Sequence, residues 1–417
     1  MCLCFCARRP QRNDEANAGG QPTVKLLYIC HRLPFPPNRG GKIRPFQMIQ
    51  HLSKTHEVTV ASLAHTAQEM EDGKPLKDHC AQVLAEVVPD ATRWRNAVTA
   101  LPSSFPSSAA YFRSSRLAKR IQEAWRNARY DGVIVHCAFA AQYALPLQGG
   151  FRVMDYGDLD SAKWSDYAKH RPFPLSTAYA VESAKLRRFE KLVAASSTHC
   201  TFTTRGECES FRELGVSKPL TVIPNGVDAG YFRRENSATT DSKVIVFLGR
   251  MDYFPNIDGI CWFAKELFGA IRARVPGATL RIVGANPARA VKELEKIPGV
   301  TVTGFVKDVR PHVNDAAVAI APLRLARGTQ NKILECMSMG IAVVSTREAA
   351  RGIQATEGEH LAVGNTPQQF IELTTELLQN PQRRMELAEA GRVQVESAHR
   401  WAASMQILDE VLGSVSA

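Results

Sequence analysis

Short apolar runs alternate with longer amphipathic segments twice along this chain, and this alternation constrains the fold more than any other feature. In the first half we expect strands at Lys25–Cys30, Val58–Leu63, Gly132–His136, Arg152–Asp155 and His199–Thr203. In the second half the runs recur at Val244–Leu248, Thr279–Val283, Val300–Thr303, Ala316–Pro322 and Ile341–Thr346. Helical periodicity between the runs predicts strand–helix–strand units, which form parallel sheets covered by helices. The fold class is therefore α/β.

The length of the chain, 417 residues, exceeds what one core usually holds, so we expect two domains. Residues 233–242 are polar and charged without hydrophobic periodicity, which is typical of a linker. This predicts an N-terminal domain over 23–232 and a C-terminal domain over 243–396. The polar, glycine-bearing residues 1–22 are predicted to be a disordered tail.

The last fifty residues are helical in pattern and longer than one domain needs. The pattern runs from about Pro367 to Leu412 and is interrupted near Asn380 and near Ser397. We expect residues 397–417 to form a helix that crosses back to the N-terminal domain, with Trp401 anchoring the crossing by burying its ring.

Composition limits where the protein works. Hydrophobic residues make up 45% of the chain, no apolar run reaches the eighteen or so residues of a membrane span, and no secretory leader is evident. A cytoplasmic enzyme is therefore expected. The ten cysteines show no Cys-x-x-Cys spacing, which favours reduced thiols over a zinc site. Cys2, Cys4 and Cys6 are either sites of acylation or oxidation, or part of the disordered tail.

The formal net charge of +11 indicates an anionic partner. Basic residues concentrate in two helical segments, 113–129 and 176–195. Such helices suit the anionic surface of a membrane, and they are equally compatible with ordinary solvated helix faces. A nucleic-acid partner is disfavoured, because no recognition-helix, zinc-finger or aromatic ribonucleoprotein signature accompanies the charge.

The segment from Ala319 to Ser345 contains the most informative candidate site. Thr329 can cap a helix that Gly340 ends, and the apolar residues of that helix face the core: Ile333, Leu334 and Met337. Lys332 and Glu335 share the opposite side near the helix N-terminus, where an anion is favoured. They are either a cation for a diphosphate with a carboxylate for sugar hydroxyls, or an ordinary surface ion pair.

Candidate residues in the N-terminal half follow predicted strands. Gly40 and Gly41 end a Pro/Gly-rich loop before a helix, where glycine allows a positive φ or the close approach of a ligand. His136 ends a strand and is either catalytic or structural. Asp158, with Asp160 as a second candidate, can accept a proton or hydrogen-bond an acceptor hydroxyl, or it caps the next helix.

Over about residues 24–410 the chain resembles the family 4 glycosyltransferases of the GT-B fold. Within them it is similar to the sugar transferases of exosortase-linked exopolysaccharide systems. The resemblance rests on five segments: 26–42 (LLYICHRLPFPPNRGGK), 153–161 (VMDYGDLDS), 222–228 (VIPNGVD), 251–258 (MDYFPNID) and 330–335 (QNKILE). Asn225 and Gly226, in the third segment, are expected to shape the interdomain turn rather than touch substrate.

The resemblance implies two doubly wound Rossmann-like domains that face across a cleft. It implies a retaining transfer of a sugar from a nucleotide-diphosphate donor to a lipid-linked or polysaccharide acceptor, without a metal or another cofactor. Arg250 and Lys332 match phosphate-binding positions, Glu335 matches the carboxylate that holds the ribose, and Gly40 with Gly41 matches a loop over the phosphates. The remaining predicted donor contacts are Gly249, Thr329, Gln330 and Asn331.

Two departures from the family pattern concern the donor sugar. Arg327 stands where the family often has a first glutamate, and the segment Met251–Asp258 replaces a lysine that usually follows the Gly-Arg pair. Lys332 is the cation that can compensate. The alternatives are a nucleotide-sugar epimerase of the same fold and a donor-binding scaffold without turnover, which the arginine at position 327 favours.

Overall fold

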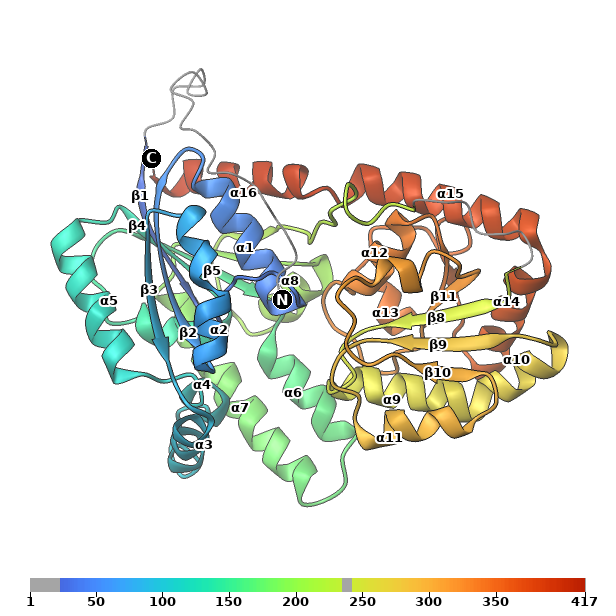
Figure 1. The fold of residues 1–417 in the computed structure, drawn as a ribbon. Coiled ribbons are helices and arrows are strands. Elements are labelled where there is room, and N and C mark those ends of the chain that lie inside the picture. The colour runs from blue at the N-terminus through green and yellow to red at the C-terminus, as the bar shows by residue number, and fades with distance from the viewer. Residues whose placement is uncertain (1–22, 235–241, 417) are drawn as a thin grey trace. The chain divides into compact units, whose positions relative to one another are not determined.

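The computed structural model describes residues 23–234 and 242–416, and their contacts group them into two units. Unit 1 comprises the described residues up to Ile223 and those from Met405 onward, whereas unit 2 runs from Pro224 to Ser404. The predicted tail, with Cys2, Cys4 and Cys6, lies outside the described residues, as does most of the predicted linker. Each unit is an α/β domain with its own parallel sheet, as the alternation predicts (Figure 1).

The sheet of unit 1 has the strand order β3-β2-β1-β4-β5-β6-β7, and the pairs are parallel. Its strands are β1 (Lys25–Cys30), β2 (Glu57–Ala64), β3 (Gln82–Val87), β4 (Gly132–His136), β5 (Phe151–Gly157), β6 (His199–Phe202) and β7 (Leu220–Val222). The chain adds strands toward one edge from β1 to β3 and toward the other edge from β4 onward. The order therefore reverses between β1 and β4, where Cys30 pairs with His136. Ligands of doubly wound sheets bind at the carboxyl ends of strands beside such a point.

Helices cover both faces of this sheet. They are α1 (Gly40–Leu52), α2 (Ala67–Asp72), α3 (Asp90–Thr99), α4 (Ser107–Ala110), α5 (Ser115–Ala128), α6 (Asp160–Lys169), α7 (Leu175–Ala195) and α8 (Arg205–Arg212), with short 3₁₀ turns at Lys74–Asp78 and Ala138–Tyr143. Four consecutive residues of β1, Leu26 to Ile29, are fully buried. Such a strand needs apolar side chains on both faces, which explains its uninterrupted apolar sequence.

Unit 2 repeats the arrangement with the order β10-β9-β8-β11-β12-β13. Its strands are β8 (Val244–Leu248), β9 (Thr279–Val283), β10 (Val300–Val302), β11 (Val318–Ala321), β12 (Ala342–Ser345) and β13 (Ala362–Val363). Its helices are α9 (Phe254–Trp262), α10 (Phe268–Arg274), α11 (Arg289–Lys292), α12 (Asn331–Ser338), α13 (Arg347–Ala350), α14 (Pro367–Gln379) and α15 (Pro381–Ala398). A π-helical turn, Phe263–Leu267, joins α9 to α10, and 3₁₀ turns lie at Glu293–Lys296 and Arg310–His312.

The last helix, α16 (Trp401–Ser416), belongs to both units, because its residues from Met405 onward group with unit 1. In unit 1, Asp409 of this helix lies 2.9 Å from His51 of α1. This confirms that the final helix crosses back. In unit 2, Trp401 is buried, and a Cβ on Gly226 would lie 2.5 Å from its backbone nitrogen. Gly226 therefore shapes this contact.

The division between the units falls at Ile223, ahead of the predicted boundary at 232. The described residues after Ile223 form hydrogen bonds with the rest of unit 2. Arg234 donates to the carbonyls of Asn314 and Ala316, and Ser338 donates to that of Phe232. Each helix in the part of the chain that the structure describes is too short or too polar to span a lipid bilayer.

Candidate active site

Lys332 lies in the first turn of α12 in unit 2, directly after the loop that follows β11. Ile333, Leu334 and Met337 of this helix are buried, as predicted. The helix ends in a Schellman motif, in which Gly340 at φ +61° donates to Met337 and Ile341 donates to Cys336. Gly340 therefore ends the helix as predicted, because the left-handed conformation needed there favours glycine.

Asn256 of α9 holds the Lys332 ammonium group through its side-chain oxygen, and its amide nitrogen donates to the carbonyl oxygen of Arg250 over 2.8 Å. Asn256 is buried, and the ammonium group also lies 4.8 Å from the ring centroid of Phe247. A Cβ on Gly249 would lie 2.7 Å from the Asn256 amide, so this position excludes a side chain. Asn256 thus connects the end of β8 to Lys332. The sequence analysis missed it, although it lies in the 251–258 segment.

Lys332 and Glu335 are half-buried and are not an exposed ion pair. Burial lowers the pKa of Lys332 to about 7, although Glu335 opposes this shift. Burial likewise raises the pKa of Glu335 to about 7, against the effect of Lys332. Among the described residues no hydrogen bond or ion pair to the Glu335 carboxyl is found. Both groups are held out of water without full compensation, which is frequent at binding sites.

The residues that precede α12 differ from the prediction in one respect. Thr329 does not cap the helix, because α12 begins one residue later than expected and Gln330 occupies the cap position without a side-chain bond to the helix. The Thr329 hydroxyl oxygen is buried and has no hydrogen-bond partner in the part of the chain that the structure describes. Gln330 donates to the carbonyl of Arg327 over 3.0 Å, and Asn331 accepts from Asn225 over 3.4 Å. The N-terminus of α12 is thus left without a side-chain cap.

Arg250 follows Gly249 at the end of β8, where the family pattern expects a phosphate-binding cation. Its guanidinium forms a fork on the carboxylate of Asp252, with distances of 3.0 and 2.5 Å. Asp252 also accepts from Asn286 over 3.2 Å. This hydrogen-bonded pair raises the pKa of Arg250 and lowers that of Asp252. Arg250 is therefore beside Lys332 in the fold but already holds a carboxylate.

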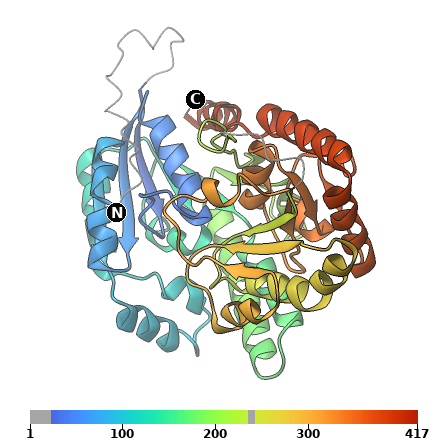
Figure 2. The same cartoon turned by 45° about the vertical axis from the view of Figure 1, so that its right-hand side comes forward.

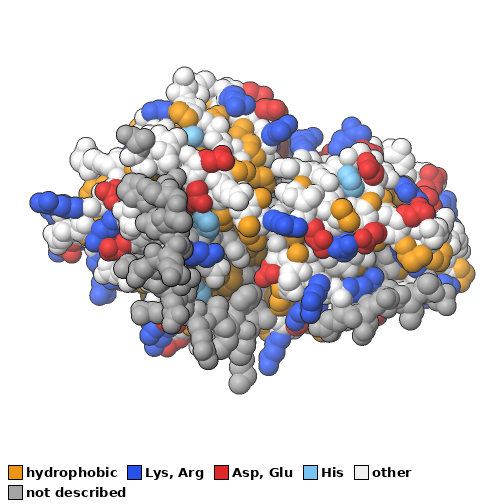
Figure 3. Space-filling model, turned by 90° about the horizontal axis from the view of Figure 1, so that it is seen from above, with side chains coloured by type: hydrophobic (Ala, Val, Ile, Leu, Met, Phe, Trp, Pro, Cys, Tyr) orange, Lys and Arg blue, Asp and Glu red, His pale blue; other side chains and the backbone are white. Residues whose placement is uncertain are grey.

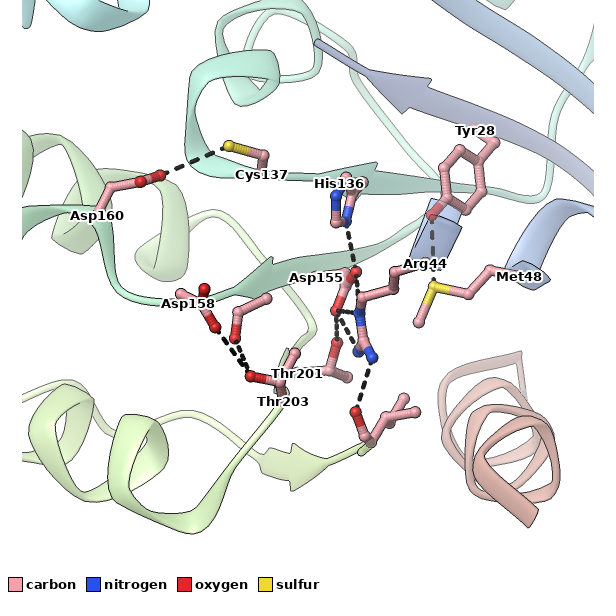
Figure 4. Close-up of polar contacts among 12 residues, drawn as sticks. Tyr28, Arg44, Met48, His136, Cys137, Asp155, Asp158, Asp160, Thr201 and Thr203 are labelled. Atoms are coloured by element: carbon pink, nitrogen blue, oxygen red, sulfur yellow. Dashed lines mark hydrogen bonds and ion pairs between the residues drawn. The ribbon is translucent and has the colours of Figure 1, made fainter. Parts of the chain in front are cut away.

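In unit 1, His136 ends β4 and is held by Asp155 of β5 (Figure 4). His136 Nδ1 lies 2.7 Å from Asp155 Oδ2. Arg44 of α1 donates to both oxygens of the same carboxylate, over 2.9 and 2.7 Å, and Thr201 donates to it over 2.7 Å. Because an ionised carboxylate only accepts, Nδ1 carries the proton in neutral His136 and Nε2 is left to accept. The structure thus fixes the orientation of the His136 ring, and Asp155 and Arg44 were missed from sequence.

Burial alone would raise the pKa of Asp155, but Arg44 and the bond from His136 hold it well below its ordinary value. Asp158 neither caps α6 nor contacts His136. The cap position is Leu159, and the Asp158 carboxylate accepts from Thr203 over 2.9 Å (Figure 4). Asp160 is the first residue of α6. Burial raises its pKa to about 6, and Cys137 Sγ lies 3.5 Å from its carboxylate.

Gly40 and Gly41 are the first two residues of α1 rather than part of the preceding loop. Neither has a positive φ, and a Cβ on Gly41 would meet nothing within 4 Å. The expectation that backbone conformation requires glycine here is therefore wrong. Arg39 occupies the cap position without a side-chain bond to the helix. What remains of the prediction is an exposed, uncapped helix N-terminus that a ligand can approach.

Two family sequence models match the chain. Residues 38–231 match the family described as Glycosyltransferase Family 4, and residues 242–380 match the family described as Glycosyl transferases group 1. No curated protein matches the sequence significantly.

Solved structures show the fold. Sucrose-phosphate synthase from Thermosynechococcus elongatus superposes with a TM-score of 0.69 at 14% identity, covering 94% of this chain and 98% of its own. HepE from Anabaena, in complex with UDP, gives a TM-score of 0.66 at 14% identity, covering 94% and 100%. A UDP-N-acetylglucosamine 2-epimerase from Listeria monocytogenes, described as putative, gives 0.54 at 16% identity, covering 93% and 95%. The fold is therefore GT-B. With the two family matches, the chain is a glycosyltransferase.

Proposed function

We propose that the protein is a retaining glycosyltransferase that transfers a sugar from a nucleotide-diphosphate donor to a hydroxyl of a lipid-linked or polysaccharide acceptor in exopolysaccharide synthesis. Unit 2 binds the donor. The observation that carries this proposal is the placement of Lys332 and Glu335 at the uncapped N-terminus of α12, beside the end of β8. HepE, of similar fold, has been solved with UDP and with UDP-glucose, which supports a nucleotide-sugar donor.

The chemistry requires fixed positive charge at the leaving diphosphate, because negative charge develops there as the glycosidic bond breaks. Lys332 and the backbone N–H groups of α12 supply it, and no metal or other cofactor is invoked. An anionic donor would raise the pKa of Lys332 above its unliganded value of about 7 and so fix the ammonium form. Glu335 accepts from the ribose hydroxyls. His136, oriented by Asp155, faces the acceptor side of the reaction in unit 1.

Acceptor-dependent release of the nucleoside diphosphate tests this function. We expect release to rise when an acceptor is added and to fall about 100-fold in Lys332→Met, whereas Lys265→Met, an exposed lysine of unit 2, stays near wild type. The anomeric configuration of the product, measured by NMR, tests retention. Release of a free, epimerised nucleotide sugar without acceptor would instead identify an epimerase, and donor binding without any product would identify a scaffold.

We further propose that the enzyme works at the anionic inner face of the cell membrane, through one end of unit 1. Apolar side chains are exposed there on α3 (Trp94 62%, Val98 58%), just after α3 (Leu101 61%) and in the turn between α6 and α7 (Phe173 82%). Both views place these elements at the same end of unit 1 (Figures 1 and 2). The neighbouring α7 adds exposed Arg187, Arg188 and Lys191. By contrast, the face in Figure 3 mixes acidic and basic side chains.

The other basic segment, residues 113–129, contributes less to this surface. Helix α5 buries Leu117 and Ile121 in the core, and its Arg120 pairs with Glu86 over 2.6 Å. The solvent-exposed face of α5 carries charged side chains. Co-sedimentation with vesicles tests the membrane proposal. We expect binding that depends on anionic lipid and is weakened by Phe173→Ser, whereas Phe305→Ser, at a similarly exposed phenylalanine of unit 2, leaves it unchanged. Equal loss in both variants would contradict it.

A further inference from the structure

A second group of charged side chains lies at the carboxyl ends of β1 and β2 in unit 1, around the start of α1. We call it the basic cluster, and it consists of Arg32, Arg39, Lys42, His65 and Arg93. Strands β1 and β2 are parallel neighbours, with Cys30 paired with Ser62, so the residues that follow them meet at one edge of the sheet. Arg39 and Lys42 join from the start of α1, and Arg93 from α3.

Two guanidinium groups of the cluster share one imidazole ring. Arg32 Nη1 lies 3.2 Å from His65 Nε2, and Arg93 Nη1 lies 2.5 Å from His65 Nδ1. A neutral imidazole has a single acceptor nitrogen, so His65 cannot accept from both arginines at once. In the part of the chain that the structure describes, Arg32 forms no ion pair with a carboxylate, and its other contact is the ring of Phe112 at 5.2 Å.

Glu69 is the acid at the centre of the cluster, and its bonds go to members of the cluster other than Arg32. Its Oε1 lies 2.6 Å from Lys42 Nζ and 3.4 Å from Arg39 Nη2, and its Oε2 accepts from the backbone N–H of His65 over 2.7 Å. Asp90 pairs with Arg93 from the solvent side and is 72% exposed. Positive charge therefore exceeds negative charge around Arg32.

The lowered pKa values of the cluster's basic groups are consistent with a shortage of negative charge around them. Burial, followed by the charge of Arg39, lowers the pKa of Arg32 to about 10. Burial lowers the pKa of His65 to about 3, with Arg32 and Arg93 as the next causes, so the ring is neutral. Burial also lowers the pKa of Lys42. An anion bound among these groups would reverse each of these shifts.

His31 connects the basic cluster to the acceptor-side histidine. It follows β1 directly and is 8% exposed, and its Nδ1 is buried without a hydrogen-bond partner among the described residues. Its ring centroid lies 6.1 Å from that of His136. A ligand on the cluster that reaches His31 would therefore come close to His136 as well.

We propose that the basic cluster, with His31, is a subsite for a phosphate group of the acceptor. Guanidinium forks match phosphate oxygens in geometry and charge. The proposal rests on the proposed function, because the donor diphosphate is there assigned to Lys332 in unit 2. The phosphate belongs either to a phosphorylated sugar residue of a polysaccharide or to a lipid-linked diphosphate, two acceptors that share this chemistry.

Isothermal titration of the full chain tests the subsite with two pairs of probes: a hexose 6-phosphate with the free hexose, and a short prenyl diphosphate with the prenyl alcohol. We expect one phosphorylated probe to bind at least tenfold more tightly than its neutral partner, and the pair in which this occurs identifies the acceptor. Saturation with the nucleoside diphosphate that binds most tightly should change the affinity for the phosphorylated probe by less than twofold.

The variants assign the binding to the cluster. We expect Arg32→Gln to weaken the phosphorylated probe at least tenfold, Arg32→Lys to weaken it less, and Lys119→Gln, an exposed lysine of α5, to leave it unchanged. Equal binding of phosphorylated and neutral probes, unchanged binding in Arg32→Gln, or displacement by the nucleoside diphosphate would overturn the proposal. Nucleotide binding by the same samples reports on the donor site separately, so failure of the proposed function is distinguished from failure of the subsite.

Discussion

The ammonium group of Lys332 is held by the side chain of Asn256, which also donates to the backbone carbonyl of Arg250. One buried amide therefore sets the position of the cation relative to the end of β8. A positively charged group acts on a developing charge only when it is already in place, so this contact matters as much as the lysine itself. The proposed donor site of unit 2 thus depends on α9, α12 and the end of β8 together.

Replacing Asn256 by alanine should displace Lys332 without removing its charge. We expect kcat/KM for the donor to fall about tenfold or more, because the ammonium group is no longer aimed at the diphosphate. Steady-state kinetics measure the change. Asn286→Ala, which removes a bond to Asp252 in the same unit, is the matched control and should have a smaller effect. Equal effects would mean that Asn256 only stabilises the fold.

Placing a side chain on Gly249 should have a similar consequence. In Gly249→Ala the new Cβ would meet the Asn256 amide at 2.7 Å and come within 3.4 Å of the Lys332 ammonium nitrogen. We expect weaker binding of the nucleoside diphosphate, measured by titration. Gly269→Ala, where a Cβ would meet nothing within 4 Å, should bind like wild type.

Glu335 should lower stability in the unliganded protein. Its folded pKa of about 7 lies above the ordinary value of 4.5, so the cost of its ionised form is present above pH 7 and is lost as the pH falls to 4.5. Glu335→Gln should therefore raise the free energy of unfolding at pH 8.5 by about 1 kcal/mol or more while it abolishes turnover. Urea unfolding at pH 8.5 and 4.5 measures this. A loss of stability at pH 8.5 would indicate a structural role.

The Arg44 and Asp155 pair should behave in the opposite way. The folded pKa of Asp155 lies below its ordinary value of 3.8, so the stability that the carboxylate contributes is present above that pH and is lost as the pH falls further. Asp155→Asn leaves Arg44 buried without its counter-charge and should cost about 3 kcal/mol or more at pH 7. Urea unfolding measures the change, and Asp131→Asn, at an exposed acid of unit 1, should cost little.

His136→Gln separates the two substrates. We expect unchanged binding of the nucleoside diphosphate and loss of acceptor-dependent turnover by about 100-fold, because the group that accepts from the acceptor is removed. Product release and nucleotide titration on one preparation measure both. His170→Gln, at an exposed histidine near the end of α6, is the control and should retain turnover. Wild-type turnover in His136→Gln would show that this histidine is structural.

The sequence alone predicts the strands that carry the sites, because buried parallel strands have uninterrupted apolar sequences that periodicity detects. It does not reveal β3, whose two ends are exposed and whose inner residues alternate between partly exposed and buried. Nor does it reveal β13, which has only two residues. Between β10 and β11, where the alternation leads us to expect a helix, the structure has only the 3₁₀ turn Arg310–His312. Helix boundaries are the weakest part, since the cap at Thr329 was misplaced by a single residue.

The candidate site was predictable where it depends on local pattern and not where it depends on distant contacts. Lys332 and Glu335 lie one turn apart on one helix, so their proximity follows from helix geometry. Arg44 and Asp155 are 111 residues apart, and their pairing depends on how α1 packs against β5. The bond from Asn256 to Lys332 spans 76 residues in the same way. Single-sequence patterns contain no signal for such pairs.

Titration of the wild-type protein and of Glu335→Ala with a panel of nucleoside diphosphates and their sugars tests the donor site most directly. Thermal unfolding is the readout, because a ligand at 100 times its Kd should add about 2.7 kcal/mol to the free energy of unfolding. We predict a shift confined to one base, reduced in Glu335→Ala and absent in Lys332→Met. A shift of equal size in all three proteins, or none with any nucleotide, would contradict a donor site on α12.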